Sequence, residues 1–156
     1  METVIAAVSG TPSERVLTAA ADLAERFLAR IVVVHVNQHM APGIRGGRYP
    51  LNVDEDERQA RIRAEVEGLR SAGADVELEI VSSRANPSTA IADAARRHGA
   101  GAIVVASDGH APLVGALGGS VAQRLIHEAP CPVIALTPET RPTAFRLVPR
   151  AAVAAA

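Results

Sequence analysis

The sequence predicts an α/β fold: a doubly wound, five-stranded parallel sheet with helices on both faces. Short apolar runs alternate along the chain with amphipathic helical stretches. Most of these runs are continuously apolar, which is typical of strands covered on both faces. Consecutive parallel strands need right-handed helical crossovers, which leads to a doubly wound sheet. One run alternates instead and suits an edge, so we expect the strand order 3-2-1-4-5.

The first strand is expected at Thr3–Val8, where TVIAAV is followed by Ser9 and Gly10. The stretch Thr11–Glu14 has the pattern of a capping box, with Thr11 as the cap and Pro12 in the first helical position. The helix that follows has an apolar stripe at one-face spacing, formed by Val16, Ala20, Leu23 and Phe27.

The second strand is expected at Ile31–Val36, where His35 is the polar exception and is interpreted as a satisfied core histidine. Residues 37–51 contain several glycines and prolines and are expected to form a long loop, either a functional lid or a locally disordered segment. Asn52 and Glu55 form a second cap-like pair, which predicts the start of the next helix.

The third strand, Val76–Val81, alternates between apolar and charged residues and is therefore expected at an edge of the sheet. Asn86 followed by proline predicts the start of the third helix. The fourth and fifth strands are expected at residues 103–106 and 133–136. Between them lie a glycine-rich loop and a short amphipathic helix.

Length and composition limit the classes of function. The chain has 156 residues, and we expect one domain over residues 1–137 and a flexible tail over 138–156. The net charge is −1 and aromatic residues make up 2%, which argues against nucleic-acid binding. There is no membrane-length apolar run and no charged signal-peptide start. Cys131 is the single cysteine and cannot form an internal disulfide, so we expect a cytoplasmic protein. Cys131 is interpreted as a structural thiol.

The loops after the first and fourth strands are the expected ligand-binding corner. In doubly wound sheets, ligands bind beyond the carboxyl ends of the strands where the winding reverses. Val8 and Ser9 end the first strand, and Val105 and Ala106 end the fourth. The loop after Ala106 leads to a helix N-terminus, where unpaired backbone N–H groups favour anions such as phosphate.

A spaced motif covers this corner. Ala106, Gly109, Gly119 and Ser120 fit a frame of glycine, two residues, glycine, nine residues, glycine and serine, with alanine in the first position. The segment HEAPCPV follows at residues 127–133. With these features the chain resembles the universal stress protein family over residues 3–136. The resemblance implies an adenine nucleotide alpha hydrolase-like fold and binding of ATP, with or without Mg²⁺.

The resemblance also implies which residues contact the nucleotide. Glycine lets backbone N–H groups approach phosphate oxygens, and a serine can cap the helix or donate to an oxygen. The phosphates would lie at Gly109, Gly119, Ser120 and the backbone of Val121. The adenine and ribose would lie at the strand ends, against Val8, Ser9, Val36, Val105 and Ala106.

Three positions depart from the family pattern. Ala106 stands where nucleotide binders have glycine, Asp108 where many have arginine or histidine, and Ser9 where they usually have an acidic residue. A carboxylate beside phosphates is repulsive unless a metal ion intervenes. Either Asp108 replaces the lost acidic residue, or ATP binding is relaxed or absent.

Three functions follow from these observations. The first is an ATP-binding regulatory module in stress response. The second is a family member that binds no nucleotide and acts through protein–protein contacts. The resemblance implies a homodimer, and the apolar segment at residues 133–137 is the edge expected to pair. The third, an ATP-hydrolysing enzyme, lacks a nucleophile, base and orienting group in one constellation. We therefore expect no catalytic residues and no metal site, and at most slow ATP hydrolysis or autophosphorylation.

Overall fold

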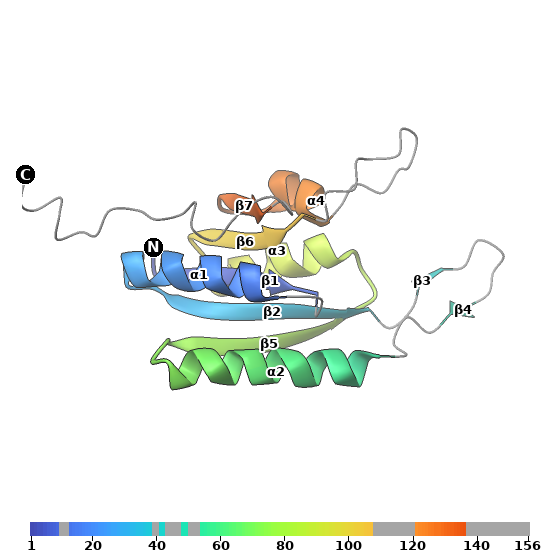
Figure 1. Ribbon diagram of the computed structural model, residues 1–156. Helices are drawn as coiled ribbons and strands as arrows, with labels where there is room; N and C mark the ends of the chain where they lie inside the picture. The colour runs from blue at the N-terminus through green and yellow to red at the C-terminus, as the bar shows by residue number, and fades with distance from the viewer. Residues whose placement is uncertain (10–12, 39–40, 43–47, 50–53, 108–120, 137–156) are drawn as a thin grey trace, which may run out of the picture.

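The computed structural model describes residues 1–9, 13–38, 41–42, 48–49, 54–107 and 121–136. In these residues strands and helices alternate as the sequence predicts, apart from two short strands, at residues 41–42 and 48–49, that follow the second strand (Figure 1). The elements in chain order are β1 Thr3–Val8, α1 Glu14–Phe27, β2 Arg30–Gln38, β3 Ala41–Pro42, β4 Arg48–Tyr49, α2 Glu55–Ser71, β5 Val76–Ser83, α3 Pro87–Arg97, β6 Ala102–Ala106, α4 Val121–Glu128 and β7 Val133–Leu136.

The main sheet has five strands in the order β5-β2-β1-β6-β7, and every neighbouring pair is parallel. Counted among these five strands, this is the predicted order 3-2-1-4-5, so the predicted fold class is confirmed. The central strand β1 is buried along its whole length, whereas β5 is only partly buried. The alternating sequence of β5 therefore reflects its place at the edge of the sheet.

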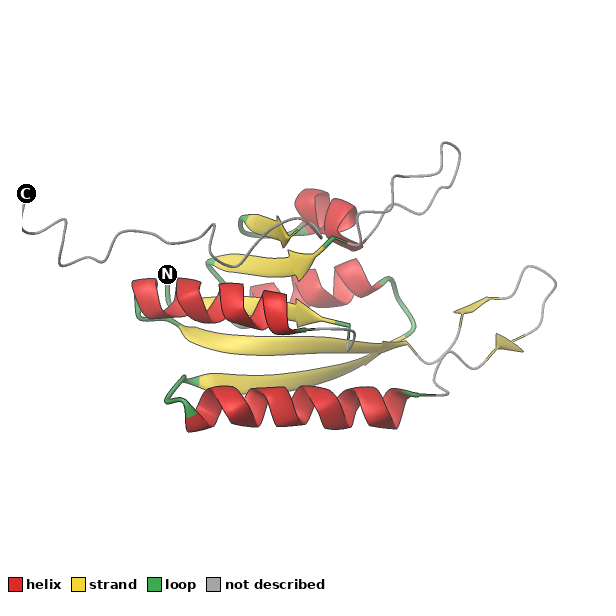
Figure 2. Ribbon diagram, viewed as in Figure 1, coloured by secondary structure: helices red, strands yellow, loops and turns green. Residues whose placement is uncertain are grey.

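Two apolar clusters cover the two faces of the sheet. The first joins α1 and α2 to the face that carries Val4, Ala6 and Val8. The second joins α3 and α4 to the face that carries Ile5 and Ala7. This alternation along β1 is the period of two expected for a strand buried on both faces. Figure 2 shows the helices in front of and behind the sheet.

The start of α1 differs from the predicted capping box. The helix begins at Glu14 with Ser13 as its N-cap, and the Ser13 side chain makes no capping hydrogen bond. Thr11 and Pro12 lie outside the described residues. Phe27 was expected in the inward stripe but is 49% exposed, because Leu17 and Ala24 complete the buried face with Val16 and Ala20.

The segment expected as one long loop, residues 37–51, contains regular structure. Strand β2 continues to Gln38, and β3 and β4 form a two-stranded antiparallel pair in which Ala41 lies opposite Tyr49. Helix α2 begins at Glu55 with Asp54 as its N-cap, without a side-chain capping bond. The predicted cap residue Asn52 lies outside the described residues.

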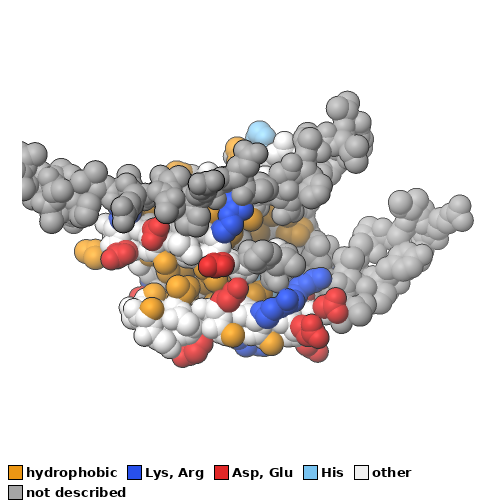
Figure 3. Space-filling view, viewed as in Figure 1, with side chains coloured by type: hydrophobic (Ala, Val, Ile, Leu, Met, Phe, Trp, Pro, Cys, Tyr) orange, Lys and Arg blue, Asp and Glu red, His pale blue; other side chains and the backbone are white. Residues whose placement is uncertain are grey.

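The start of α3 agrees with the prediction. Asn86 is the N-cap, and its side-chain oxygen accepts a hydrogen bond from the Ser88 backbone N–H at 3.2 Å. On the molecular face shown in Figure 3, acidic and basic side chains lie along α2, and hydrophobic side chains lie between α1 and α2. Among the described helices, none is both long and apolar enough to cross a membrane.

Candidate functional site

The carboxyl ends of β1 and β6 form the point at which the winding of the sheet reverses. These strands are neighbours, with Ala7 directly opposite Val105. The chain leaves β1 toward α1 on one face, and α4, the helix after β6, packs on the other face. When the crossovers from two neighbouring strands run to opposite faces of the sheet, a crevice forms between the strand ends. In α/β sheets ligands bind in this crevice.

The predicted site residues divide between the two faces of this edge. Val36, Val105 and Val121 all belong to, or pack against, the apolar cluster shared with α3 and α4. Val8 belongs to the cluster on the opposite face. The structure therefore brings three of the predicted residues to one face of the sheet and separates Val8 from them.

Ser9 and Ala106, the two predicted residues directly at the strand ends, are exposed. The backbone continues past Ala106 in the sheet, since the N–H of Ser107 donates to the carbonyl oxygen of Leu136 at 2.8 Å. A hydroxyl at Ser9 can donate or accept a hydrogen bond but brings no negative charge to this edge.

The glycine loop carries the other predicted contacts. Gly109, Gly119 and Ser120 lie outside the described residues, as does Asp108, so their assignment to phosphate binding stays a prediction. Val121 is the first residue of α4 and is half-buried. The start of this helix therefore lies on the same face as Val36 and Val105.

The apolar residues at this edge suit one part of a nucleotide. Val36 and Val81 lie opposite each other on β2 and β5, and both are half-buried against the cluster. Partly exposed valines offer an apolar surface on which a flat ring can lie, whereas phosphates need N–H groups or cations. Among the described side chains, no three His, Cys, Asp or Glu residues are grouped to hold a metal ion.

His35 lies beside this edge and is satisfied in the core, as predicted. It is 3% exposed, with Nδ1 3.0 Å from the carbonyl oxygen of Val8 and Nε2 2.8 Å from Oε1 of Glu55. Glu55 was predicted as half of a cap-like pair with Asn52, which lies outside the described residues. In the structure Glu55 is the first residue of α2, and its carboxylate contacts His35. Nothing in the sequence around Glu55 indicated that its partner would be His35, 20 residues away on β2.

The pKa of Glu55 shows how this contact is stabilised. Burial by itself raises the pKa of a carboxyl group. Here the hydrogen bonds from Gln59 and His35, together with the electrostatic attraction of His35 and Arg58, outweigh burial, so the pKa of Glu55 lies below its ordinary value. Glu55 is therefore a buried carboxylate that stays ionised.

Cys131 agrees with its interpretation as a structural thiol. It precedes β7 and packs against the cluster on the face of α3 and α4. Burial raises the pKa of the thiol, which disfavours the reactive thiolate.

Comparison with known protein families shows which family the chain belongs to. The model of the Universal stress protein family matches residues 1–137. The chain belongs to the universal stress protein family. The matched residues include all five strands of the main sheet and the whole motif from Ala106 to Ser120. No curated protein matches the sequence.

Solved structures of the family share this fold. The chain is similar to a universal stress protein from Archaeoglobus fulgidus, with 28% identity, a TM-score of 0.64 and coverage of 86% of this chain and 93% of that one. A family protein from Burkholderia pseudomallei has 25% identity, a TM-score of 0.62 and coverage of 86% and 95%. An Archaeoglobus fulgidus universal stress protein in complex with dAMP has 30% identity, a TM-score of 0.58 and coverage of 86% and 96%.

Proposed function

We propose that this chain binds an adenine nucleotide at the carboxyl ends of β1 and β6 and acts as a cytoplasmic regulatory module in stress response. One observation carries the proposal. Val36, Val105 and Val121, three residues of the predicted site, belong to or pack against one apolar cluster on the face of the sheet covered by α3 and α4. Family membership and the relative crystallised with dAMP support the same ligand class.

The chemistry of the site divides the nucleotide into two parts. The adenine ring would lie on the half-buried valines, because a flat aromatic ring gains from leaving water. The phosphates would lie at Gly109, Gly119 and Ser120, whose spacing fits the family motif. Ser9 would offer a hydroxyl to the ribose in place of a carboxylate.

A more specific part of the proposal concerns which adenine nucleotide is bound. We propose ATP as the ligand, with Asp108 supplying the negative charge that Ser9 lacks and binding Mg²⁺ between itself and the phosphates. AMP lacks the β- and γ-phosphates that the ion would join to Asp108, so the two nucleotides separate the two parts of the proposal. Removal of Mg²⁺ with a chelator is expected to weaken ATP binding and leave AMP binding unchanged.

Calorimetric titration of the folded protein with ATP and AMP tests the proposal. Gly119→Val is expected to abolish binding, since a branched side chain would block the approach of a phosphate. Gly68→Val is the matched control: a Cβ at Gly68 on α2 would have no heavy atom within 4 Å. Absence of binding to the unaltered protein at millimolar nucleotide would contradict the proposal.

A second candidate, a homodimer that acts through protein contacts, is supported by the edge of the sheet. Strand β7 is the last strand of its sheet, and Ile126 on the neighbouring helix α4 is 59% exposed. We propose that two copies pair through residues 133–137, since edge strands expose hydrogen-bonding groups. Light scattering at micromolar protein concentration tests this, and a monomeric mass would contradict it.

A further inference from the structure

His35 connects the candidate site to the first turn of α2. It lies on β2 directly opposite Val8, the last residue of β1. Its ring is in contact with both elements, through the Val8 carbonyl at 3.0 Å and the Glu55 carboxylate at 2.8 Å. The side chains of His35 and Glu55 are 3% and 8% exposed, so water does not compete for these bonds.

The two contacts require two protons. A carbonyl oxygen only accepts, so Nδ1 of His35 must carry the hydrogen that is donated to Val8. Nε2 faces an oxygen of Glu55 that already accepts a hydrogen bond from Gln59 at 2.9 Å. If Nδ1 carries the only hydrogen of a neutral ring, Nε2 has a lone pair and no hydrogen. Nε2 and the carboxylate oxygen, both acceptors, would then face each other. The second hydrogen bond therefore needs a proton between Nε2 and Oε1.

That second proton belongs to the ring. Gln59 donates to the same carboxylate oxygen at 2.9 Å and Arg58 lies 3.9 Å from the other, and both favour the ionised carboxylate, so Glu55 is the acceptor and His35 the donor from both nitrogens. The geometry is that of an imidazolium ion held in the core by one carbonyl and one carboxylate. A buried charge of this kind is stable only while its partner is in place.

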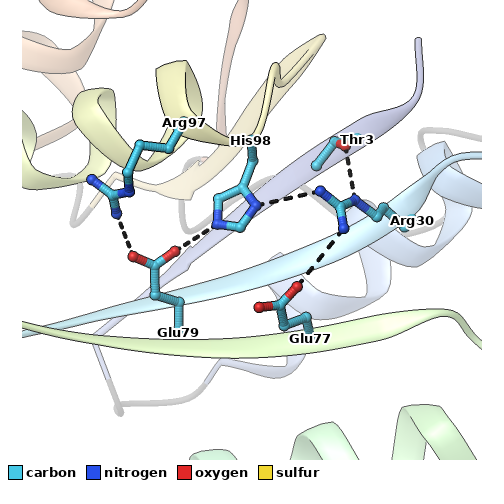
Figure 4. A network of polar contacts seen from close by, with 6 residues as sticks. All are labelled: Thr3, Arg30, Glu77, Glu79, Arg97 and His98. Atoms are coloured by element: carbon cyan, nitrogen blue, oxygen red, sulfur yellow. Dashed lines mark hydrogen bonds and ion pairs between the residues drawn. The ribbon is translucent and has the colours of Figure 1, made fainter.

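A second histidine–glutamate pair in the same protein does not need the extra proton (Figure 4). Nε2 of His98 lies 2.7 Å from Oε2 of Glu79, while Nδ1 faces Nη2 of Arg30 at 3.4 Å. A guanidinium group only donates, so Nδ1 of His98 accepts and its neutral ring satisfies both partners. The chain thus contains an internal comparison for His35.

Few other charged groups face the His35 ring. From α2 it faces Glu55, with Arg58 behind at 3.9 Å from Glu55 Oε2. Strand β5 places Ile80 opposite His35, and β1 contains no titratable side chain. The side chains with which α1 enters the cluster on this face are apolar. Among the described residues, the charge state of the ring is therefore coupled mainly to Glu55.

We propose that His35 and Glu55 form a proton-dependent latch that positions the carboxyl end of β1. His35 is a positioning residue, which acts on the site through the Val8 carbonyl next to Ser9. The consequence for ligands rests on the proposed nucleotide-binding function. While the ring holds both protons, α2, β2 and β1 are tied together at the candidate site. Loss of the Nε2 proton as the pH rises breaks the bond to Glu55 and unties α2 from β2 and β1, while the bond from Nδ1 to Val8 remains. The strand end then loses its tie to α2, so nucleotide affinity falls with rising pH.

Nuclear magnetic resonance of ligand-free protein, labelled at the histidine ring nitrogens and the valine carbonyl carbons, tests the latch itself. At pH 6.5 we expect hydrogens on both ring nitrogens of His35, and a carbonyl signal of Val8 that shifts when the Nε2 proton is lost. Glu55→Gln is expected to leave a neutral ring with its hydrogen on Nδ1, because the new amide can donate to Nε2. The matched control Glu79→Gln is expected to leave His35 and Val8 unchanged. A single ring proton on His35 at pH 6.5, or a Val8 signal that ignores the titration, overturns the latch; both readouts use the unaltered protein and do not depend on a variant that folds.

Calorimetric titration with AMP at pH 6 and pH 9 tests the coupling. The affinity of the unaltered protein and of Glu79→Gln is expected to fall by at least about fivefold, a typical size for coupling between two sites. Glu55→Gln is expected to lose this difference, while titration of the AMP phosphate affects all three proteins equally. Equal pH dependence in all three overturns the coupling. If Val8 follows His35 but AMP binds at neither pH, the proposed function fails while the latch is supported.

Discussion

Glu128, the last residue of α4, accepts a hydrogen bond from the Ser88 hydroxyl in the first turn of α3, with Oγ 3.1 Å from Oε2. Thr89 donates to the same oxygen at 3.2 Å, and Arg96 donates to the Glu128 backbone carbonyl at 2.9 Å. Ser88 is fully buried. These bonds connect the two helices that cover one face of the sheet, including the helix that follows the predicted glycine loop.

Ser88→Ala is expected to destabilise the protein by about 1–2 kcal/mol, since it removes a buried donor from a charged acceptor. Thr89→Ala removes a donor from the same carboxylate at an exposed position and should cost less than about 1 kcal/mol. Urea unfolding of both variants measures the difference. Equal losses would show that burial of Ser88 does not decide the strength of this contact.

Glu79 on β5 is expected to stabilise the protein in a pH-dependent way. Burial works to raise its pKa, but hydrogen bonds from His98 and Arg97 outweigh this, so the pKa of Glu79 lies below its ordinary value. A group with a lowered pKa in the folded state stabilises the protein above its unfolded pKa, about 4.3 for glutamate, and loses this effect as the pH falls through the folded value. The difference in unfolding free energy between the unaltered protein and Glu79→Gln should be full at pH 6 and shrink below about pH 4.

Glu77→Gln is the matched control on the same strand. Its ion pair with Arg30 is longer, at 3.8 Å, and both side chains are about half exposed. Exposed pairs of this kind contribute about 0–1 kcal/mol, so Glu77→Gln should change stability little at any pH. An effect of Glu77→Gln as large as that of Glu79→Gln would contradict the assignment.

Two glycines near the end of α2 should respond oppositely to alanine. Gly68 lies inside the helix, and a Cβ there would meet no heavy atom within 4 Å, so Gly68→Ala should stabilise the protein by about 0.5–1 kcal/mol. Gly73 follows the helix with φ of +91°, which a side chain rarely adopts, so Gly73→Ala should destabilise it by about 1–2 kcal/mol. Thermal unfolding measures both, and a shared sign would refute the backbone argument.

Helix α1 offers a test of which face is buried. Leu17 is 5% exposed and belongs to the core cluster, so Leu17→Ala should cost about 2–5 kcal/mol. Phe27 is 49% exposed and should lose less than about 1.5 kcal/mol on replacement by alanine, despite its larger side chain. If urea unfolding showed a larger loss of stability for Phe27→Ala than for Leu17→Ala, the result would support the apolar stripe predicted from the sequence and contradict the buried face seen in the structure.

Comparison of the two helix starts shows why local patterns predicted some contacts and missed others. Asn86 caps α3 through a bond to Ser88, two residues away, and a bond of that range can be predicted from the local sequence. Glu55 had an equally plausible local role, but its partner His35 lies on another element. The fold places the His35 ring within hydrogen-bonding distance of the Glu55 carboxylate, and the local sequence around Glu55 does not indicate this partner.

The sequence by itself determined the order of the five strands, the burial of β1, the exposed edge of β5 and the family, because each of these depends on apolar periodicity or on a spaced motif. The tertiary structure alone decided the polar partners, namely His35 with Glu55, His98 with Glu79 and Ser88 with Glu128. It also decided that Val8 lies on the opposite face from Val36, Val105 and Val121. The physical reason is that burial follows from a residue's own chemistry and period, whereas a hydrogen bond depends on where packing places a second residue distant in sequence.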